Sequence, residues 1–84
     1  MRYDYITFRS VTFAQRGERV LQSAKIRCTL QRTPRWMEEQ GCGYCLRLYA
    51  RQLAAAAELL TREGVPFRKL YEQTAGGQLE EVSL

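Results

Sequence analysis

The chain has 84 residues, of which 45% are hydrophobic and 26% are charged. This length supports one domain with one small core, and the composition is that of a folded protein rather than a disordered chain. The sequence has no histidine, which excludes Ser-His-Asp triads, Cys-His pairs and histidine-ligated metals. Its net charge is +4.

The composition also bears on where the protein works. The longest uncharged apolar run spans only residues 53–57, so no transmembrane helix is expected. The first residues lack the apolar stretch of a signal peptide. The three cysteines are an odd number, unlike the even set of a secreted disulfide scaffold. We therefore expect a cytoplasmic protein that does not bind membranes.

The first part of the chain predicts a strand, a helix and a second strand. Residues 3–8 are rich in aromatic and β-branched side chains, which favour a strand. Ser10 is a candidate N-cap for the helix that follows. Apolar or small residues recur in this helix at helical spacing, namely Ala14, Gly17, Leu21 and Ala24. Residues 26–32 alternate between apolar and polar side chains, which indicates a half-buried strand.

The second part predicts a strand, a helix and a last strand. Residues 45–50 alternate like the second strand, and residues 52–63 have the clearest helical periodicity in the chain. Gly64 is expected to end this helix. Residues 65–72 complete the pattern as a strand.

This order of elements predicts an α+β, ferredoxin-like βαββαβ fold. In such a fold, two helices cover one face of a four-stranded antiparallel sheet, and the other face is open to solvent or to a partner. The domain would occupy residues 1–72. Residues 73–84 would form a C-terminal tail that adds an edge strand, docks elsewhere or stays disordered.

The loop between the second and third strands contains a Cys-x-x-Cys pair at residues 42–45. Its first member, Cys42, could be a reactive thiolate that carries a persulfide or selenide anion, with Cys45 as a resolving thiol that discharges the cargo. Glycine N–H groups and guanidinium groups near the loop would stabilise such an anion. The residues that we predict to do so are Arg35, Gly41, Gly43 and Arg47.

Other interpretations of the pair remain open. A thioredoxin-type dithiol is followed by a helix, whereas a strand follows here. A zinc site needs four ligands, and one chain offers only Cys28 in addition, so two chains would have to share the metal. Without either chemistry, the pair would be two small, weakly reactive residues near a turn.

Three short motifs occur in a characteristic order: Ile6-Thr7-Phe8-Arg9-Ser10, Thr33-Pro34-Arg35, and Cys42-Gly43 followed by Leu46-Arg47. In this order the chain resembles a family of small bacterial selenium/sulfur carrier-like proteins, from about Tyr5 to Tyr71. The resemblance implies that a cysteine, by position Cys42, accepts selenium or sulfur as a persulfide-type species and delivers it to a partner enzyme. Similar proteins often have serines where Gln40-Gly41 stand here. Cys45 is not part of the family pattern, so its resolving role is our own hypothesis.

We therefore expect a carrier or binding protein rather than an enzyme. It would need no metal or resident cofactor, because selenium or sulfur is a transient covalent cargo. Its partners would be a chalcogen donor and an acceptor protein, and the uncovered sheet face could also form a homodimer.

A second function also fits the expected fold, because a ferredoxin-like sheet with exposed aromatic residues is the architecture of many RNA-binding domains. The chain would then be a small basic RNA-binding or protein-interaction domain that uses the uncovered face. It lacks the aromatic-rich Lys/Arg-Gly-Phe signature of those domains on the third strand. The candidate stacking and phosphate-binding residues are Tyr5, Tyr44, Tyr49, Arg27, Arg47 and Arg68.

Overall fold

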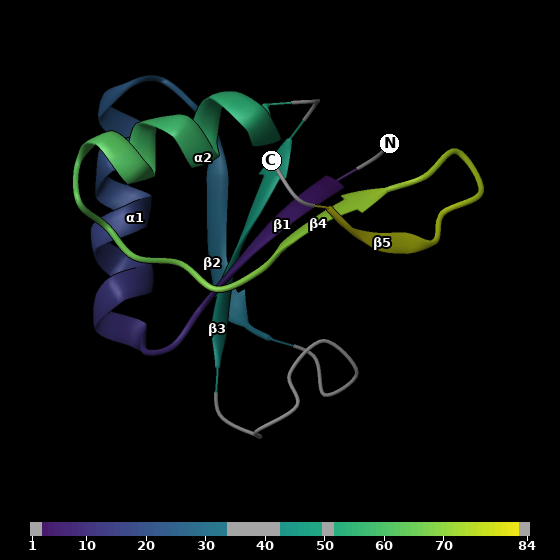
Figure 1. The fold of residues 1–84 in the computed structure, drawn as a ribbon, viewed down its shortest axis with the longest axis horizontal. Coiled ribbons are helices and arrows are strands. Elements are labelled where there is room, and N and C mark those ends of the chain that lie inside the picture. Colours follow the sequence, from purple (N-terminus) through teal and green to yellow (C-terminus); the bar gives the residue numbers. More distant parts are fainter. Residues whose placement is uncertain (1–2, 34–42, 50–51, 83–84) are drawn as a thin grey trace.

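The computed structural model describes residues 3–33, 43–49 and 52–82. These residues form one antiparallel sheet with the strand order β2-β3-β1-β4-β5, together with two helices (Figure 1). The predicted α+β class with two helices is therefore confirmed. The elements in chain order are β1 (Tyr3–Phe8), α1 (Val11–Ser23), β2 (Cys28–Arg32), β3 (Tyr44–Tyr49), α2 (Leu53–Arg62), β4 (Leu70–Gln73) and β5 (Leu79–Val82).

The sheet has a fifth strand, so the prediction of four strands was wrong. β5 lies within the segment expected to be a tail, and it pairs with β4 from Leu70↔Val82 to Gln73↔Leu79. A tight turn joins the two strands, in which the N–H of Thr74 donates to the carbonyl of Gln78 at 2.7 Å. The two glycines before β5 thus form a hairpin turn instead of ending the fold.

Both helices pack against one face of the sheet, where they enclose the core. Ile6 and Phe8 of β1 and Leu46 and Leu48 of β3 point into this core and are fully buried. The buried helix residues are Ala14, Gly17 and Leu21 of α1 and Leu53, Ala56, Ala57 and Leu60 of α2. These residues are the predicted apolar faces of the two helices, except that Ala24 is exposed and lies just beyond the end of α1.

Gly17 lies where α1 comes closest to the sheet. A Cβ atom at this position would lie 2.9 Å from Cζ of Phe8 and 3.4 Å from a methyl carbon of Leu46. The absent side chain therefore lets the helix backbone approach β1 and β3. The helix begins at the predicted cap, because the hydroxyl of Ser10 accepts a hydrogen bond from the N–H of Phe13 at 3.3 Å.

The other side of the sheet, which we call the open face, lies opposite both helices. It is formed by the residues of β1, β2 and β3 that alternate with the core residues: Tyr3, Tyr5, Thr7, Thr29, Gln31, Cys45, Arg47 and Tyr49. The pairing places them in rows across three neighbouring strands. Neither described helix is long and apolar enough to cross a membrane.

Candidate functional site

The β2–β3 hairpin presents the loop that contains the Cys-x-x-Cys pair. The N–H of Thr33 donates to the carbonyl of Gly43 at 3.0 Å, which closes the hairpin at the point where the strands end. Gly43 is buried there. Three of the predicted site residues lie outside the described residues, namely Arg35, Gly41 and Cys42.

Cys45 is on the open face of β3, and its side chain is fully buried. It pairs with Thr7 on one side and with Gln31 on the other. Burial raises the pKa of its thiol, an effect that the side chains of Thr33 and Gln31 and the charge of Arg47 only partly offset. The group is therefore a protonated, inaccessible thiol at neutral pH.

Cys28 is on the helix-facing side of β2, and it is half-buried. Burial, with a smaller contribution from the negative charge of Glu18, raises the pKa of its thiol to about 11. Cys28 and Cys45 are both free thiols. Neither one is poised to react as a thiolate near neutral pH.

Arg47 is not directed toward Gly43. Its guanidinium lies 4.6 Å from the centre of the Tyr3 ring and 5.8 Å from the centre of the Tyr49 ring. Because Tyr3 pairs with Tyr49 at the far end of β3, the side chain extends away from the hairpin loop. A hydrogen bond to Tyr49 raises the pKa of Arg47 further, so the group is a permanent cation.

These contacts belong to a cluster at the end of the open face remote from Gly43. We call Tyr3, Tyr49, Arg27 and Arg47 the tyrosine–arginine cluster. The two rings meet edge to face with centroids 5.3 Å apart, and the guanidinium of Arg27 lies 5.2 Å from the centre of the Tyr49 ring. The hydroxyl groups of Thr29 and Tyr49 are 3.0 Å apart and share a hydrogen bond. Hydrogen bonds with Thr29 and Arg47 lower the pKa of Tyr49, because they stabilise the ionised form of the phenol.

Sequence reasoning found part of this cluster. Arg27, Arg47 and Tyr49 were among the candidate nucleic-acid contacts, but Tyr3 was missed. Tyr3, Tyr5 and Thr7 occupy every second position of β1 and therefore share one face of the sheet, and this spacing could have identified Tyr3. Tyr44 faces the helices instead, where Arg32 lies 5.8 Å from the centre of its ring.

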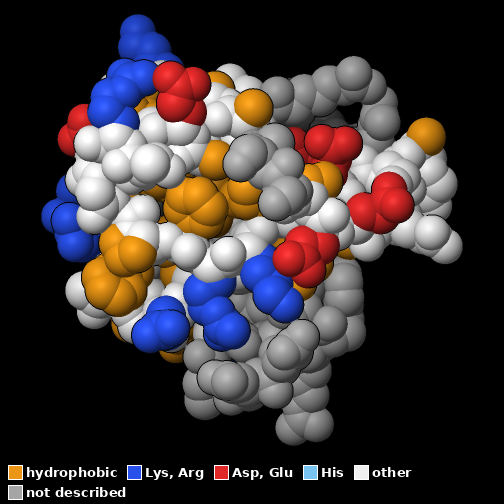
Figure 2. Space-filling view, viewed as in Figure 1, with side chains coloured by type: hydrophobic (Ala, Val, Ile, Leu, Met, Phe, Trp, Pro, Cys, Tyr) orange, Lys and Arg blue, Asp and Glu red, His pale blue; other side chains and the backbone are white. Residues whose placement is uncertain are grey.

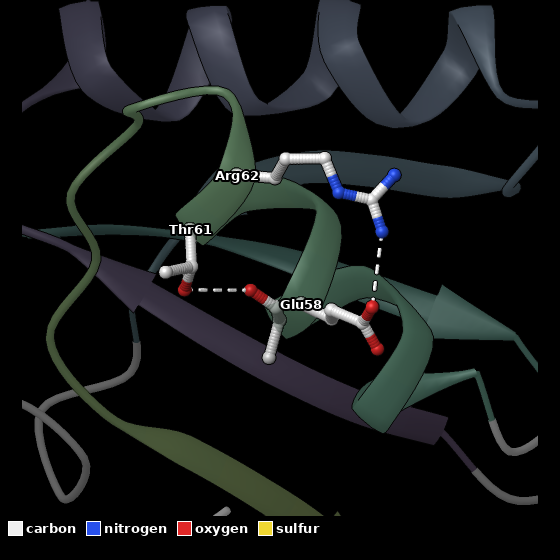
Figure 3. A network of polar contacts seen from close by, with 4 residues as sticks. Glu58, Thr61 and Arg62 are labelled. Carbon is white, nitrogen blue, oxygen red and sulfur yellow. Dashed lines mark hydrogen bonds and ion pairs between the residues drawn. The ribbon is translucent and has the colours of Figure 1, made fainter.

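A groove runs between α2 and the β4–β5 hairpin on the opposite side of the molecule. Figure 2 shows hydrophobic side chains gathered on this face, with charges of both signs around them. Two of its cations have acidic partners: Arg62 bonds Glu58 at 3.0 Å (Figure 3), and Lys69 lies 3.9 Å from Glu81. The charges along this groove are therefore largely compensated within the protein.

No metal site is evident in the part of the chain that the structure describes. Within residues 3–33, 43–49 and 52–82, no three His, Cys, Asp or Glu side chains gather where they could hold an ion. The shared zinc site considered above would need ligands from outside these ranges.

Comparison with protein families identifies the one to which the chain belongs. The model of a family described as "Putative Se/S carrier protein-like" matches residues 2–72. No curated protein and no solved structure matches the chain. The matched segment begins before β1 and ends within β4, so it includes both helices and the loop that bears the Cys-x-x-Cys pair. The chain therefore belongs to the Se/S carrier protein-like family.

Proposed function

We propose that the protein carries selenium or sulfur as a persulfide-type species on Cys42 and delivers it to a partner enzyme. The observation that carries this proposal is the family membership over residues 2–72. The environment of the other two thiols supports the choice of cysteine, because burial raises the pKa of both Cys28 and Cys45. A chalcogen acceptor must be an accessible thiolate, and by elimination this role goes to Cys42.

Loading and delivery are two exchanges of the same kind. In loading, the thiolate of Cys42 attacks the terminal sulfur of a donor persulfide, the S–S bond of the donor breaks, and the donor leaves as a thiolate. In delivery, an acceptor thiolate attacks the terminal sulfur on Cys42, and Cys42 is regenerated as a thiolate. Neither step needs an oxidant, a metal or a resident cofactor, so the protein acts as a carrier rather than an enzyme. Such chemistry suits the reducing cytoplasm.

The residues around the loop would stabilise the cargo anion in this proposal. Arg35 and Gly41 keep the roles predicted from the sequence. Gly43 is buried at the hairpin end, and Arg47 acts at longer range, because its guanidinium is stacked on Tyr3. Cys45 is a slow resolving thiol, since attack requires both exposure and loss of its proton. A thiol of the acceptor protein is therefore the main route of delivery.

The scaffold supports such a role. The order of the first four strands, β2-β3-β1-β4, supports classing the domain as ferredoxin-like. A loop held by two paired strands is positioned by a rigid sheet while remaining available to partners.

Mass spectrometry of the intact chain and of its peptides tests the proposal. After incubation with cysteine persulfide, one additional sulfur atom is expected on the peptide that contains Cys42. The Cys42→Ser variant should lose this adduct and the Cys28→Ser variant should keep it. An adduct that persists in Cys42→Ser, or no adduct on the wild type, contradicts the proposal.

The role of Cys45 needs a separate measurement. In the Cys45→Ser variant, loading and transfer to a small acceptor thiol should proceed at nearly the wild-type rate. A large loss of transfer would instead make Cys45 the principal resolving thiol.

A further inference from the structure

We propose that the tyrosine–arginine cluster and the open face around it bind single-stranded RNA. This inference does not depend on the carrier chemistry. It uses the end of the sheet remote from Gly43, and it involves neither Cys42 nor Cys45.

The cluster combines the kinds of side chain that bind single-stranded nucleic acids. Single-stranded nucleic acids are bound by aromatic rings and guanidinium planes, on which bases stack, together with cations that contact phosphates. Tyr3 and Tyr5 on β1 and Tyr49 on β3 supply rings on the two neighbouring central strands. Arg47 lies between the rings, and Arg27 lies over Tyr49 at the rim.

The charges on the open face favour an anionic ligand. In β1, β2 and β3, none of the described residues on the open face is acidic. On the same side of the sheet, the register places Glu81 of β5 beyond Tyr71, and this carboxylate lies 3.9 Å from the ammonium group of Lys69. Arg27 and Arg47 have tyrosine rings and hydroxyl groups as neighbours there, whereas in the groove beside α2 Arg62 and Lys69 lie next to glutamates. An anionic ligand is the partner that complements this surface.

The surface beside the cluster is hollowed. A groove of about 360 Å³ adjoins the cluster, at the lower end of the size range of about 300–1,000 Å³ for small-ligand sites. It is lined by Lys25, Arg27, Thr29 and Tyr49 among others. The groove therefore brings two cations, which can contact phosphates, next to an aromatic ring, on which a base can stack.

The hydroxyl groups favour RNA over DNA. Thr29 and Tyr49 place two hydroxyls 3.0 Å apart beside the rings, and Gln31 adds an amide on the same strand. Such groups can exchange hydrogen bonds with a ribose 2′-hydroxyl, which DNA lacks.

Fluorescence anisotropy with a labelled oligouridine of about ten nucleotides tests the inference. The full chain should bind it, and the affinity should fall steeply between about 50 and 200 mM salt. Tyr49→Ala and Arg27→Ala should each weaken binding about five- to tenfold or more, and Tyr49→Phe should keep most of it because the ring remains. Arg16→Ala is the matched control, since it removes an equal charge from an exposed position on α1. It should change the affinity by no more than about twofold.

Several results would overturn the inference. They are absence of binding at low salt, equal losses for Arg27→Ala and Arg16→Ala, and equal affinity for the matching deoxyoligonucleotide. A concentration-dependent dimer in sedimentation, abolished by Arg27→Glu, would assign the face to a second copy of the chain. Because Arg27 is exposed, its substitution tests the surface without disturbing the core. If the wild-type chain fails to bind the oligouridine but is loaded normally with persulfide sulfur, the RNA-binding inference is wrong and the proposed carrier function is unaffected.

Discussion

At the scale of single residues, the cysteines show how position in the fold sets chemistry. Alternation along residues 45–50 correctly predicts that Cys45 and Leu46 point to opposite faces of the sheet. It does not predict that Cys45 is fully buried, because burial depends on neighbours from β1 and β2 that are distant in the sequence. A buried thiol with a raised pKa contributes mainly to packing, even when it is part of a Cys-x-x-Cys pair.

The raised pKa of Cys28 predicts a pH dependence of stability. Its pKa is about 11 in the folded protein against an ordinary value of 9.0, so folding favours the neutral thiol. The resulting stabilisation is complete below pH 9.0 and is lost as the pH rises through about 11. The free energy of unfolding in urea should therefore fall over this interval, and it should fall less in Cys28→Ser. Equal losses in the two proteins would mean that Cys28 does not contribute.

The tight contact at Gly17 predicts that a single methyl group is harmful there. Gly17→Ala adds helix propensity of about 1 kcal/mol, but its Cβ would lie 2.9 Å from Cζ of the fully buried Phe8. Overpacking should dominate, with a net loss of about 1–2 kcal/mol in the free energy of unfolding. Gln15→Ala, at an exposed position of the same helix, should be neutral or slightly stabilising. A Gly17→Ala variant as stable as the wild type would show that Phe8 can move aside.

At the scale of elements, prediction succeeded where periodicity was long and failed where it was short. Helix α2 and the strands β1 and β3 were predicted to within one or two residues, because each carries a full alternating or helical pattern. The last strand was expected over residues 65–72, yet β4 begins only at Leu70. β5 has four residues, too few for a pattern to distinguish from a tail. Only its pairing with β4 defines it as a strand.

The conformation of the β4–β5 turn predicts that alanine substitutions at its two adjacent glycines differ in their effect on stability. Gly77 has φ of 87°, a conformation that favours glycine, and its N–H donates to the carbonyl of Thr74 at 2.9 Å. Gly77→Ala should therefore destabilise the protein by about 1 kcal/mol, measured by urea unfolding. At Gly76, a Cβ would meet only Thr74 Oγ1, at an ordinary 3.9 Å, so Gly76→Ala should cost less. Equal effects would show that the turn adopts another backbone conformation in solution.

At the scale of the whole molecule, the two proposed activities are assigned to opposite ends of the β2–β3 hairpin. One end of the β2–β3 hairpin is closed by the hydrogen bond between Thr33 and Gly43, and the tyrosine–arginine cluster lies at the other end. The sequence indicated Arg47 as a partner of the loop, since the two are close along the chain. The structure instead stacks Arg47 on Tyr3, which is 44 positions away along the chain (47 minus 3). Such a contact depends on strand register, which local patterns do not specify.

This separation predicts that the two proposed activities can be removed one at a time. Arg27→Ala should weaken binding of the oligouridine but leave persulfide loading at the wild-type level, because Arg27 is at the remote end of the sheet. Cys42→Ser should abolish loading and leave RNA affinity unchanged, since the substitution alters none of the rings and none of the arginines of the cluster. Both readouts are needed on both variants, by mass spectrometry and by anisotropy. If one variant lost both activities while remaining folded by circular dichroism, the loop and the open face would form a single site, and cargo and RNA would be coupled.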